Sequence, residues 1–151
     1  MNIEIQTCMR AEGLTESFKS FIRSWEYWTL DELLSALKTG NYTLFFARDG
    51  EKTVAALLTL RSGEFIDVIY LYTDVNYRRK NLALNLLEEC EREMRWLGTE
   101  KRIFLEVRRD NTPAQKLYEA FGMKRQGVRT KYYKDGCDAF VYCKEMGTDA
   151  P

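Results

Sequence analysis

The spacing of apolar residues changes several times along the chain and predicts both strands and helices. Apolar and polar residues alternate over residues 3–7, as they do in a strand with one buried face. Over residues 14–25 the apolar residues recur every three or four positions, which predicts a helix. Residues 29–32 form a capping box in front of another apolar stripe, and Gly40 marks the end of this second, short helix.

Three strand-like runs follow, over residues 42–48, 53–60 and 65–73. An Asp-Gly dipeptide at 49–50 and a Ser-Gly dipeptide at 62–63 separate them, and both dipeptides are typical of tight turns. These three runs therefore predict an antiparallel meander.

Helical and strand periods alternate in the second half of the chain. An apolar helical face extends from Leu82 to just before Gly98, and residues 102–108 return to the strand period. Another helix is expected between a cap at residues 111–112 and Gly122. The last two strands are expected over residues 123–129 and 137–144, on either side of an Asp-Gly turn at 135–136.

The predicted order is strand, helix, helix, three strands, helix, strand, helix, strand, strand. Helices between strands require crossover connections, so the sheet of about seven strands must be mixed. The expected fold class is α/β, or α+β by a stricter convention. With 151 residues and no linker-like segment, the chain is expected to form one domain over residues 1–146, followed by a flexible tail over 147–151.

Composition narrows the chemistry. Lys and Arg total 23, as do Asp and Glu, and this balance argues against nucleic acid or an anionic membrane as a partner. Histidine is absent, which excludes Ser-His and Cys-His nucleophiles and the common zinc sites that use His. A general base must therefore be another group, such as a carboxylate, and no metal is expected.

The four cysteines show no CxxC pairing and are interpreted as unpaired, mostly buried residues. The sequence shows neither a signal peptide nor a long apolar stretch. Both observations favour a reducing cytoplasm as the compartment.

A short basic turn joins the strand at 65–73 to the helix that begins at Leu82. The amide groups at a helix N-terminus form an anion site, and Arg78, Arg79 and Lys80 add positive charge to it. The residues from Arg78 to Ala83 resemble the Q/R-x-x-G-x-G/A turn of the GNAT acetyltransferases, with Asn81 in place of the first glycine. Asparagine tolerates the left-handed backbone conformation better than most other residues do.

The second half of the chain extends this resemblance. Residues 105–123 resemble the pattern LEVRxxN…A..LYE..GF, and residues 127–139 resemble G…YY..G.DA. Together these patterns are similar to the RimI-type ribosomal-protein-alanine N-acetyltransferase branch and its protein N-terminal acetyltransferase relatives. The resemblance covers roughly residues 66–146.

The resemblance implies roles for individual residues, with acetyl-CoA as the cosubstrate. Glu106 matches the general base, Tyr118 the general acid that protonates the CoA thiolate, and Asn111 a residue that hydrogen-bonds the cofactor. Tyr132 and Tyr133 resemble residues that line the acceptor groove. The other implied cofactor-binding positions are Leu71, Tyr72, Thr73, Arg78, Arg79, Lys80, Asn81, Leu82, Ala83 and Leu84. Trp28, beside Trp25 and Tyr27, is a candidate for the other wall of the acceptor groove.

Each of these assignments competes with a purely structural interpretation. Glu106 can be a surface residue paired with Arg102 or Arg108 on the same strand face. Tyr118 can be part of ordinary helix packing, and Asn111 is a good N-cap in its own right. The tyrosine and tryptophan positions can equally belong to the core.

The function expected from these residues is N-acetylation of a primary amine. At pH 7, neutralising a protein α-amine costs about 1 kcal/mol and neutralising a lysine costs about 4.6 kcal/mol, so a lone carboxylate suits an N-terminal amine. The alternatives are acetylation of a small amine, such as a polyamine, amino sugar or aminoglycoside, and a noncatalytic CoA-binding module. Either a monomer or a homodimer is compatible with the sequence.

Overall fold

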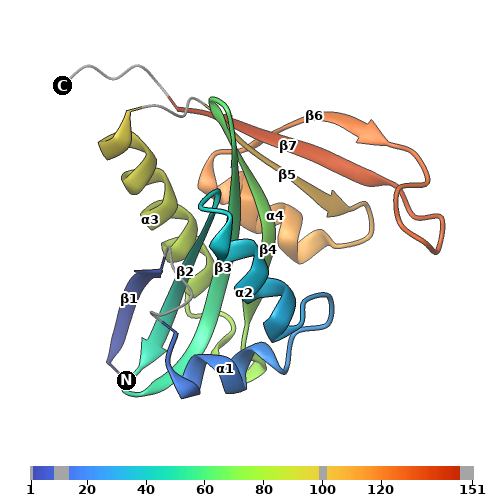
Figure 1. Ribbon diagram of the computed structural model, residues 1–151. Coiled ribbons are helices and arrows are strands. Elements are labelled where there is room, and N and C mark those ends of the chain that lie inside the picture. The colour runs from blue at the N-terminus through green and yellow to red at the C-terminus, as the bar shows by residue number, and fades with distance from the viewer. Residues whose placement is uncertain (1, 9–13, 99–101, 147–151) are drawn as a thin grey trace.

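The computed structural model describes residues 2–8, 14–98 and 102–146, and within them seven strands form one mixed sheet (Figure 1). The strands are β1 (Ile3–Cys8), β2 (Tyr42–Asp49), β3 (Lys52–Ser62), β4 (Phe65–Thr73), β5 (Arg102–Arg108), β6 (Lys124–Arg129) and β7 (Ala139–Glu145). Their order in the sheet is β1-β2-β3-β4-β5-β7-β6. The β4–β5 pair is parallel and the other pairs are antiparallel, so the predicted mixed sheet is confirmed.

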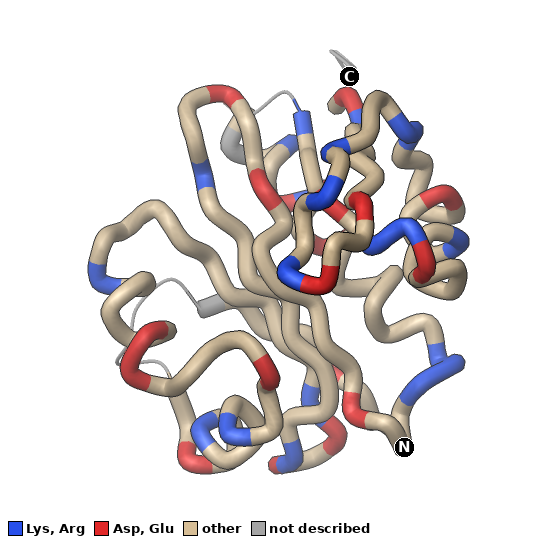
Figure 2. The backbone as a smooth tube through the Cα atoms, turned by 90° about the vertical axis from the view of Figure 1, so that its right-hand side faces the viewer, with Lys and Arg blue, Asp and Glu red and all other residues tan. Residues whose placement is uncertain are grey.

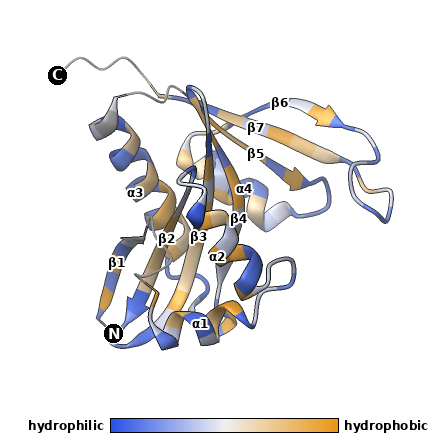
Figure 3. Cartoon of the chain, in the orientation of Figure 1, coloured by the Kyte–Doolittle hydropathy of each residue, from blue (hydrophilic) through white to orange (hydrophobic). Residues whose placement is uncertain are grey.

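Helices cover both faces of the sheet (Figure 1), and the central strands are coloured mostly as hydrophobic in Figure 3. The helices are α1 (Glu16–Ile22), α2 (Leu30–Lys38), the short 3-10 helix η2 (Val75–Tyr77), α3 (Leu82–Leu97) and α4 (Thr112–Phe121). One core cluster joins α1 and α2 to alternate residues of β2 and β3, such as Leu44 and Phe46. The other joins α3 and α4 to the opposite face, through Phe45 and Leu57. This alternation follows from the two-residue period of a strand.

The two N-terminal helices follow the sequence signals closely, with one difference in length. At α2 the capping box is complete, because Thr29 Oγ1 accepts from Glu32 N at 3.2 Å and Glu32 Oε2 accepts from Thr29 N at 2.8 Å. Helix α1 ends at Ile22, one turn before Trp25, where the periodicity predicted its end. The apolar spacing persists beyond the helix because Trp25 is still buried and packs on Tyr70, with 4.6 Å between ring centroids.

The feature that shapes the centre of the sheet is the brief contact between β4 and β5. Their pairing covers only residues 65–67 and 102–104, although β4 continues to Thr73 and β5 to Arg108. Figure 1 shows the two strands diverging beyond this point. A bulge contributes to the divergence: Val68 and Tyr70 pair with consecutive residues of β3, which leaves Ile69 as an extra residue that bends β4.

Charged residues of both signs are interspersed along the chain, as Figure 2 shows. In the part of the chain that the structure describes, no helix combines the length and the apolar character needed to cross a membrane. The expectation of a flexible tail over 147–151 lies outside the described residues.

Candidate active site

The divergence of β4 and β5 produces a cavity of about 890 Å³. Its walls are residues 68–71 of β4 and 105–108 of β5, together with Asn111, Ala114 and Tyr118 around α4. Residues 132–135 and Tyr27 complete the lining. The cavity therefore brings together Glu106, Tyr118, Asn111 and the tyrosine pair, which are well separated in the sequence.

Glu106 presents its carboxylate to the cavity from β5 and has two partners there. Arg129 Nε lies 3.0 Å from Glu106 Oε1, and the Tyr132 hydroxyl donates to Glu106 Oε2 at 3.4 Å. The side chain keeps 34% of its surface exposed, so an incoming group can still reach it. The sequence-based alternative of a pair with Arg102 or Arg108 is wrong, because those two arginines bind other carboxylates.

A second carboxylate, that of Asp67 on β4, lies close enough to Glu106 to sense its charge. Partial burial raises the pKa of Asp67, the negative charge of Glu106 raises it further, and Arg129 acts in the opposite direction. Asp67 belongs to none of the motifs recognised in the sequence. The signal that was available is an acidic residue within the otherwise apolar and aromatic run of β4.

Tyr118 lies on the cavity wall and in the hydrophobic core at the same time. Burial raises the pKa of its phenol to about 12, and the nearby Tyr133 adds to the shift. The ring packs against Tyr142 with 6.3 Å between centroids. The packing interpretation and the functional interpretation of this residue are therefore compatible, since the same side chain contacts the core and lines the cavity.

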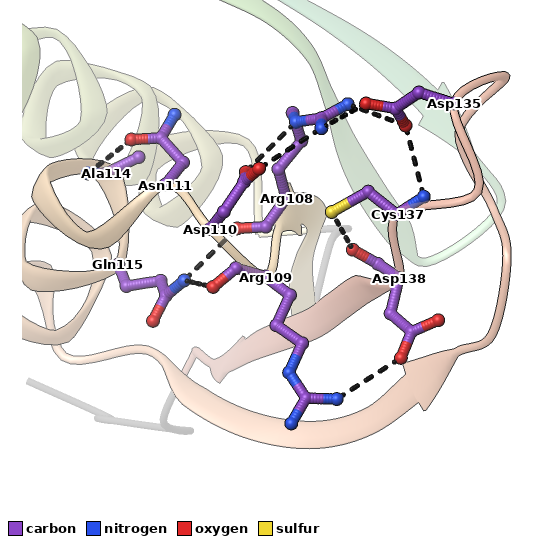
Figure 4. A network of polar contacts seen from close by, with 9 residues as sticks. All are labelled: Arg108, Arg109, Asp110, Asn111, Ala114, Gln115, Asp135, Cys137 and Asp138. Carbon is purple, nitrogen blue, oxygen red and sulfur yellow. Dashed lines mark hydrogen bonds and ion pairs between the residues drawn. The ribbon is translucent and has the colours of Figure 1, made fainter.

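Asn111 caps α4, as its position in the sequence predicts. Its Oδ1 accepts from the amide of Ala114 at 3.2 Å (Figure 4). The oxygen is the capping atom, so the Nδ2 donor of the same amide is not used for the cap. Asn111 also lines the cavity.

The predicted cofactor segment of β4 is only partly in the cavity. Leu71 lines it, whereas Tyr72 and Thr73 do not. Tyr72 instead stacks on Tyr70, with 6.4 Å between centroids and 16° between ring planes. The lining begins earlier along β4 than predicted, at Val68, because the strand separates from β5 immediately after residue 67.

The basic turn before α3 lies outside this cavity. Arg79 and Asn81 both have left-handed backbone angles, with φ of 63° and 60°, and at residue 81 this is a conformation that asparagine tolerates better than most other residues do. Asn81 precedes α3 without making a side-chain cap, and the first turn of α3 contains no acidic residue. The amides of Leu82, Ala83 and Leu84, in the first turn of α3, therefore receive no hydrogen bond from the Asn81 side chain.

Side chains around this turn hold it against β4. The Nε of Arg78 donates to the carbonyl oxygen of Thr73 at 3.2 Å, and its guanidinium lies 6.0 Å from the centre of the Tyr72 ring. Lys80 is exposed. The predicted residues Tyr72 and Thr73 thus support the turn and do not line the cavity.

Tyr132 and Tyr133 line the cavity as a perpendicular pair, with 5.1 Å between ring centroids. Trp28 is not brought to them. It packs on Tyr42 at 6.2 Å and lines a separate shallow depression along α2. Its neighbour Tyr27, 71% exposed, is the aromatic residue of this segment that lines the cavity.

The described side chains do not meet the requirements of a metal site, and the cysteines among them are free thiols. Among residues 2–8, 14–98 and 102–146, no cluster of three or more His, Cys, Asp or Glu side chains is arranged to hold a metal ion. Cys90 and Cys143 are buried free thiols, and Cys137 is a half-buried one. The side chain of Cys8 lies outside the described residues.

A mixed sheet opened between two parallel strands, with a carboxylate and a phenol in the opening, is an architecture suited to acyl transfer. The chain matches the model of the acetyltransferase (GNAT) family over residues 7–123, and it belongs to that family. The fold agrees with this assignment. The crystal structure of the ribosomal-protein-S18-alanine N-acetyltransferase from Escherichia coli superposes with a TM-score of 0.77 at 23% identity, covering 99% of each chain.

Two further relatives are informative. An N-alpha-acetyltransferase of Saccharolobus solfataricus is 36% identical over 87 residues, which are 58% of this chain and 50% of that protein. The chain thus spans about half the length of that curated relative. The structure of Arabidopsis thaliana NAA60 in complex with acetyl-CoA has a TM-score of 0.79 at 15% identity, covering 96% of this chain and 99% of that one.

Proposed function

We propose that the protein transfers the acetyl group of acetyl-CoA to the α-amine of a polypeptide N-terminus. The observation that carries this proposal is the opening between β4 and β5, which places Glu106 and Tyr118 on the walls of one cavity. The names of the relatives, N-alpha-acetyltransferase and ribosomal-protein-S18-alanine N-acetyltransferase, support the same class of acceptor.

The backbone of the opening suits the extended arm of acetyl-CoA. Beyond residue 67 the edge of β4 that faces β5 is not paired with it, and backbone N–H and C=O groups require partners. An amide-containing arm bound along residues 68–71 would provide them, as an added strand does. The pyrophosphate would bind at the amides of residues 79–84. This segment contains the left-handed residues Arg79 and Asn81 and the N-terminus of α3, whose first N–H groups have no partner within the helix. The charges of Arg78, Arg79 and Lys80 would add to its binding.

The reaction needs a base for the amine and a donor for sulfur. The amine nitrogen attacks the thioester carbonyl carbon, the C–N bond forms, and the C–S bond breaks. Glu106 accepts the proton that the amine loses, directly or through water, and the departing thiolate is protonated to give free CoA. Asn111 Nδ2 is the cavity group that we assign to hydrogen-bonding the cofactor.

The raised pKa of Tyr118 defines its part in this step. A phenol with a pKa of about 12 is fully protonated at neutral pH and is available as a donor. Complete proton transfer to a thiolate, whose conjugate acid has a pKa near 8.5, is uphill by roughly 3.5 units, or about 5 kcal/mol. Tyr118 therefore acts mainly by a hydrogen bond that strengthens as charge develops on sulfur, and the proton from the amine restores the balance.

The acceptor end of the cavity favours a polypeptide. Tyr27 and Tyr132 are 71% and 50% exposed and provide aromatic surface at the mouth, where an extended chain can continue into solvent. The carboxylate of Glu106, with Asp67 nearby, favours the approach of an amine that is mostly cationic at pH 7. An α-amine costs less to neutralise there than a lysine does, by about 3.5 kcal/mol.

The proposal is tested by incubating the protein with labelled acetyl-CoA and an equimolar panel of acceptors. The panel contains peptides with free N-termini, the same peptides with blocked N-termini and an internal lysine, and small polyamines and amino sugars. Mass spectrometry is expected to find the label on the free α-amines, with equimolar release of CoA thiol. Labelling of small amines alone would contradict the proposed acceptor.

A variant distinguishes catalysis from cofactor binding alone. Glu106→Gln keeps the shape of the side chain and removes the base, so turnover is expected to fall by about 10²–10⁴-fold while the Kd for acetyl-CoA changes little. CoA binding without thiol release by the wild-type protein would instead favour a noncatalytic CoA-binding module.

A further inference from the structure

Arg108, the last residue of β5, binds two carboxylates that belong to different segments (Figure 4). On one side its Nε and Nη2 lie 3.1 and 3.2 Å from the oxygens of Asp110, in the turn that leads to α4. On the other side Nη2 and Nη1 lie 2.6 and 3.3 Å from the oxygens of Asp135. Such paired hydrogen bonds fix the orientation of both partners. Arg108 correspondingly lowers the pKa of both carboxyls.

Asp135 lies within the loop of residues 130–138, called here the tyrosine loop, and organises its tip. Its Oδ1 also accepts from the amide of Cys137 at 3.1 Å. The carbonyl of Cys137 in turn accepts from the amide of Tyr133 at 3.1 Å. The amide of Gly136 donates to the carbonyl of Tyr133 at 2.9 Å. Arg108 therefore holds the residue around which the tip of the tyrosine loop is folded.

A second link, through Arg109, fixes the base of the tyrosine loop. The Arg109 side chain lies 3.3 Å from Asp138 Oδ2, and its amide donates to the Asp138 carbonyl at 3.0 Å. Asp138 Oδ1 accepts from the amide of Lys131 at 2.9 Å. Lys131 has a φ of 50°, a left-handed conformation that is unfavourable for a non-glycine residue, and the hydrogen bond that its amide donates to Asp138 stabilises it.

The tyrosines of this loop are placed by the same residue. The Arg108 guanidinium lies 4.9 Å from the centre of the Tyr133 ring, and Tyr133 packs at right angles to Tyr132. The hydroxyl of Tyr132 then reaches Glu106, two residues before Arg108 on the same face of β5. The tyrosine loop thus contacts β5 twice, through Tyr133 on Arg108 and through the Tyr132 hydroxyl on Glu106.

We infer that Arg108 is a positioning residue for the acceptor: by binding Asp135, it holds Tyr132 and Tyr133 over Glu106 before any acceptor arrives. This inference rests on the proposed function, because it gives the tyrosine pair the role of an acceptor wall. A loop that is already ordered loses less conformational entropy when the acceptor binds. Arg108 therefore sets the KM for the acceptor and has little influence on acetyl-CoA. Since the ion pair is partly exposed, salt screens it.

The two carboxylates bound by Arg108 supply a matched pair of variants. Asp135→Asn removes the charge that reaches the tyrosine loop, whereas Asp110→Asn removes the charge that reaches only the α4 turn. For Asp135→Asn we expect the KM of a peptide acceptor to rise about tenfold, with kcat within about threefold and the Kd for acetyl-CoA unchanged. For Asp110→Asn we expect the acceptor KM within about twofold of wild type. Raising the salt concentration is expected to increase the acceptor KM of wild type more than that of Asp135→Asn.

A measurement without any substrate tests the structural half of the inference. Hydrogen exchange at the amides of Tyr133 and Cys137 is expected to be faster in Asp135→Asn than in wild type, and unchanged in Asp110→Asn. Unchanged exchange in Asp135→Asn, or equal effects of the two variants on KM, would overturn the inference. Failure of the proposed function is recognised separately, as absence of turnover by the wild-type protein with every peptide.

Discussion

Arg129 and Glu106 form an ion pair across the sheet, with 3.0 Å between Nε and Oε1. They lie on β6 and β5, two strands that are separated by β7. The pair brings a positive charge to the carboxylate that we propose as the general base. An acceptor amine that approaches Glu106 therefore competes with a guanidinium for the same oxygens.

Arg129→Gln removes this competitor and is expected to lower the KM for a peptide acceptor by about threefold. Both effects of the arginine act in the same direction, because it occupies Glu106 and repels a cationic amine. The size follows from the modest free energy of exposed ion pairs, 0.2–1 kcal/mol. Steady-state kinetics with a free N-terminal peptide measures it. Arg125→Gln on the same strand is the control, since Arg125 lies over the Phe140 ring. An acceptor KM that stays the same in Arg129→Gln would contradict the competition.

Tyr118→Phe is expected to lower kcat by about 10²-fold or more, while the Kd for acetyl-CoA stays within about threefold of wild type. The phenol must be protonated to donate, and with a pKa of about 12 it remains protonated throughout the neutral and moderately alkaline range. The kcat of the wild type should therefore show no alkaline decrease from this group up to about pH 10.

Tyr142→Phe is the matched control for Tyr118→Phe. Tyr142 packs against Tyr118, but its hydroxyl bonds to Glu119 at 3.2 Å and is not part of the cavity lining. Its loss is expected to affect stability and to leave kcat unchanged. Equal decreases in kcat and in acetyl-CoA affinity for Tyr118→Phe would argue that this residue acts only through packing.

Asn81→Gly is expected to bind acetyl-CoA severalfold more tightly than wild type and to have a free energy of unfolding within about 0.5 kcal/mol of it. Glycine adopts the left-handed angles of this position freely and removes a side chain from the proposed phosphate site. Calorimetric titration and chemical denaturation measure the two quantities. Asn85→Gly, inside α3, should lose about 0.3 kcal/mol of stability, because glycine is only slightly poorer than asparagine in a helix interior. Weaker binding by Asn81→Gly would show that the asparagine side chain contributes to the phosphate site.

Substitutions at Asn111 separate its capping role from its proposed cofactor role. Asn111→Ala removes the acceptor for the Ala114 amide, so it should cost about 1 kcal/mol of stability. Asn111→Asp keeps a good cap and stays within about 0.5 kcal/mol of wild type, but replaces the Nδ2 donor with a carboxylate oxygen. Both variants are expected to raise the Kd for acetyl-CoA about tenfold. A normal Kd in Asn111→Asp would limit this residue to capping.

Local signals in the sequence predict the order of elements well. The capping box at Thr29 and the hairpin glycines Gly50 and Gly63, with φ of 61° and 62°, depend only on neighbouring residues. The left-handed conformation of Asn81 is predicted for the same reason, because few other residues accept it. Such features depend on residues that are close together in the sequence, so the sequence alone is enough to predict them.

Features that depend on distant parts of the chain were harder to predict. The partners of Glu106 come from β6 and from the tyrosine loop, and no periodicity within β5 indicates them. Trp28 and Tyr27 are neighbouring aromatic residues that the sequence does not distinguish, and the packing of Trp28 on Tyr42 leaves Tyr27 to line the cavity. The point where β4 separates from β5 depends on a bulge in the pairing of β4 with β3. The sequence of β4 gives no sign of this bulge, because the residues next to it on both sides are apolar or aromatic.

The three-residue contact between β4 and β5 also leaves few backbone hydrogen bonds between the two parts of the sheet. Strands β1 to β4 form one part of the sheet and β5 to β7 the other, and the backbone ladder that joins the two parts covers only residues 65–67 and 102–104. A ligand that fills the opening contacts both β4 and β5, so it links the two parts of the sheet where their backbone hydrogen bonds end. Since such a ligand binds the folded chain alone, its concentration raises the resistance of the whole domain to unfolding.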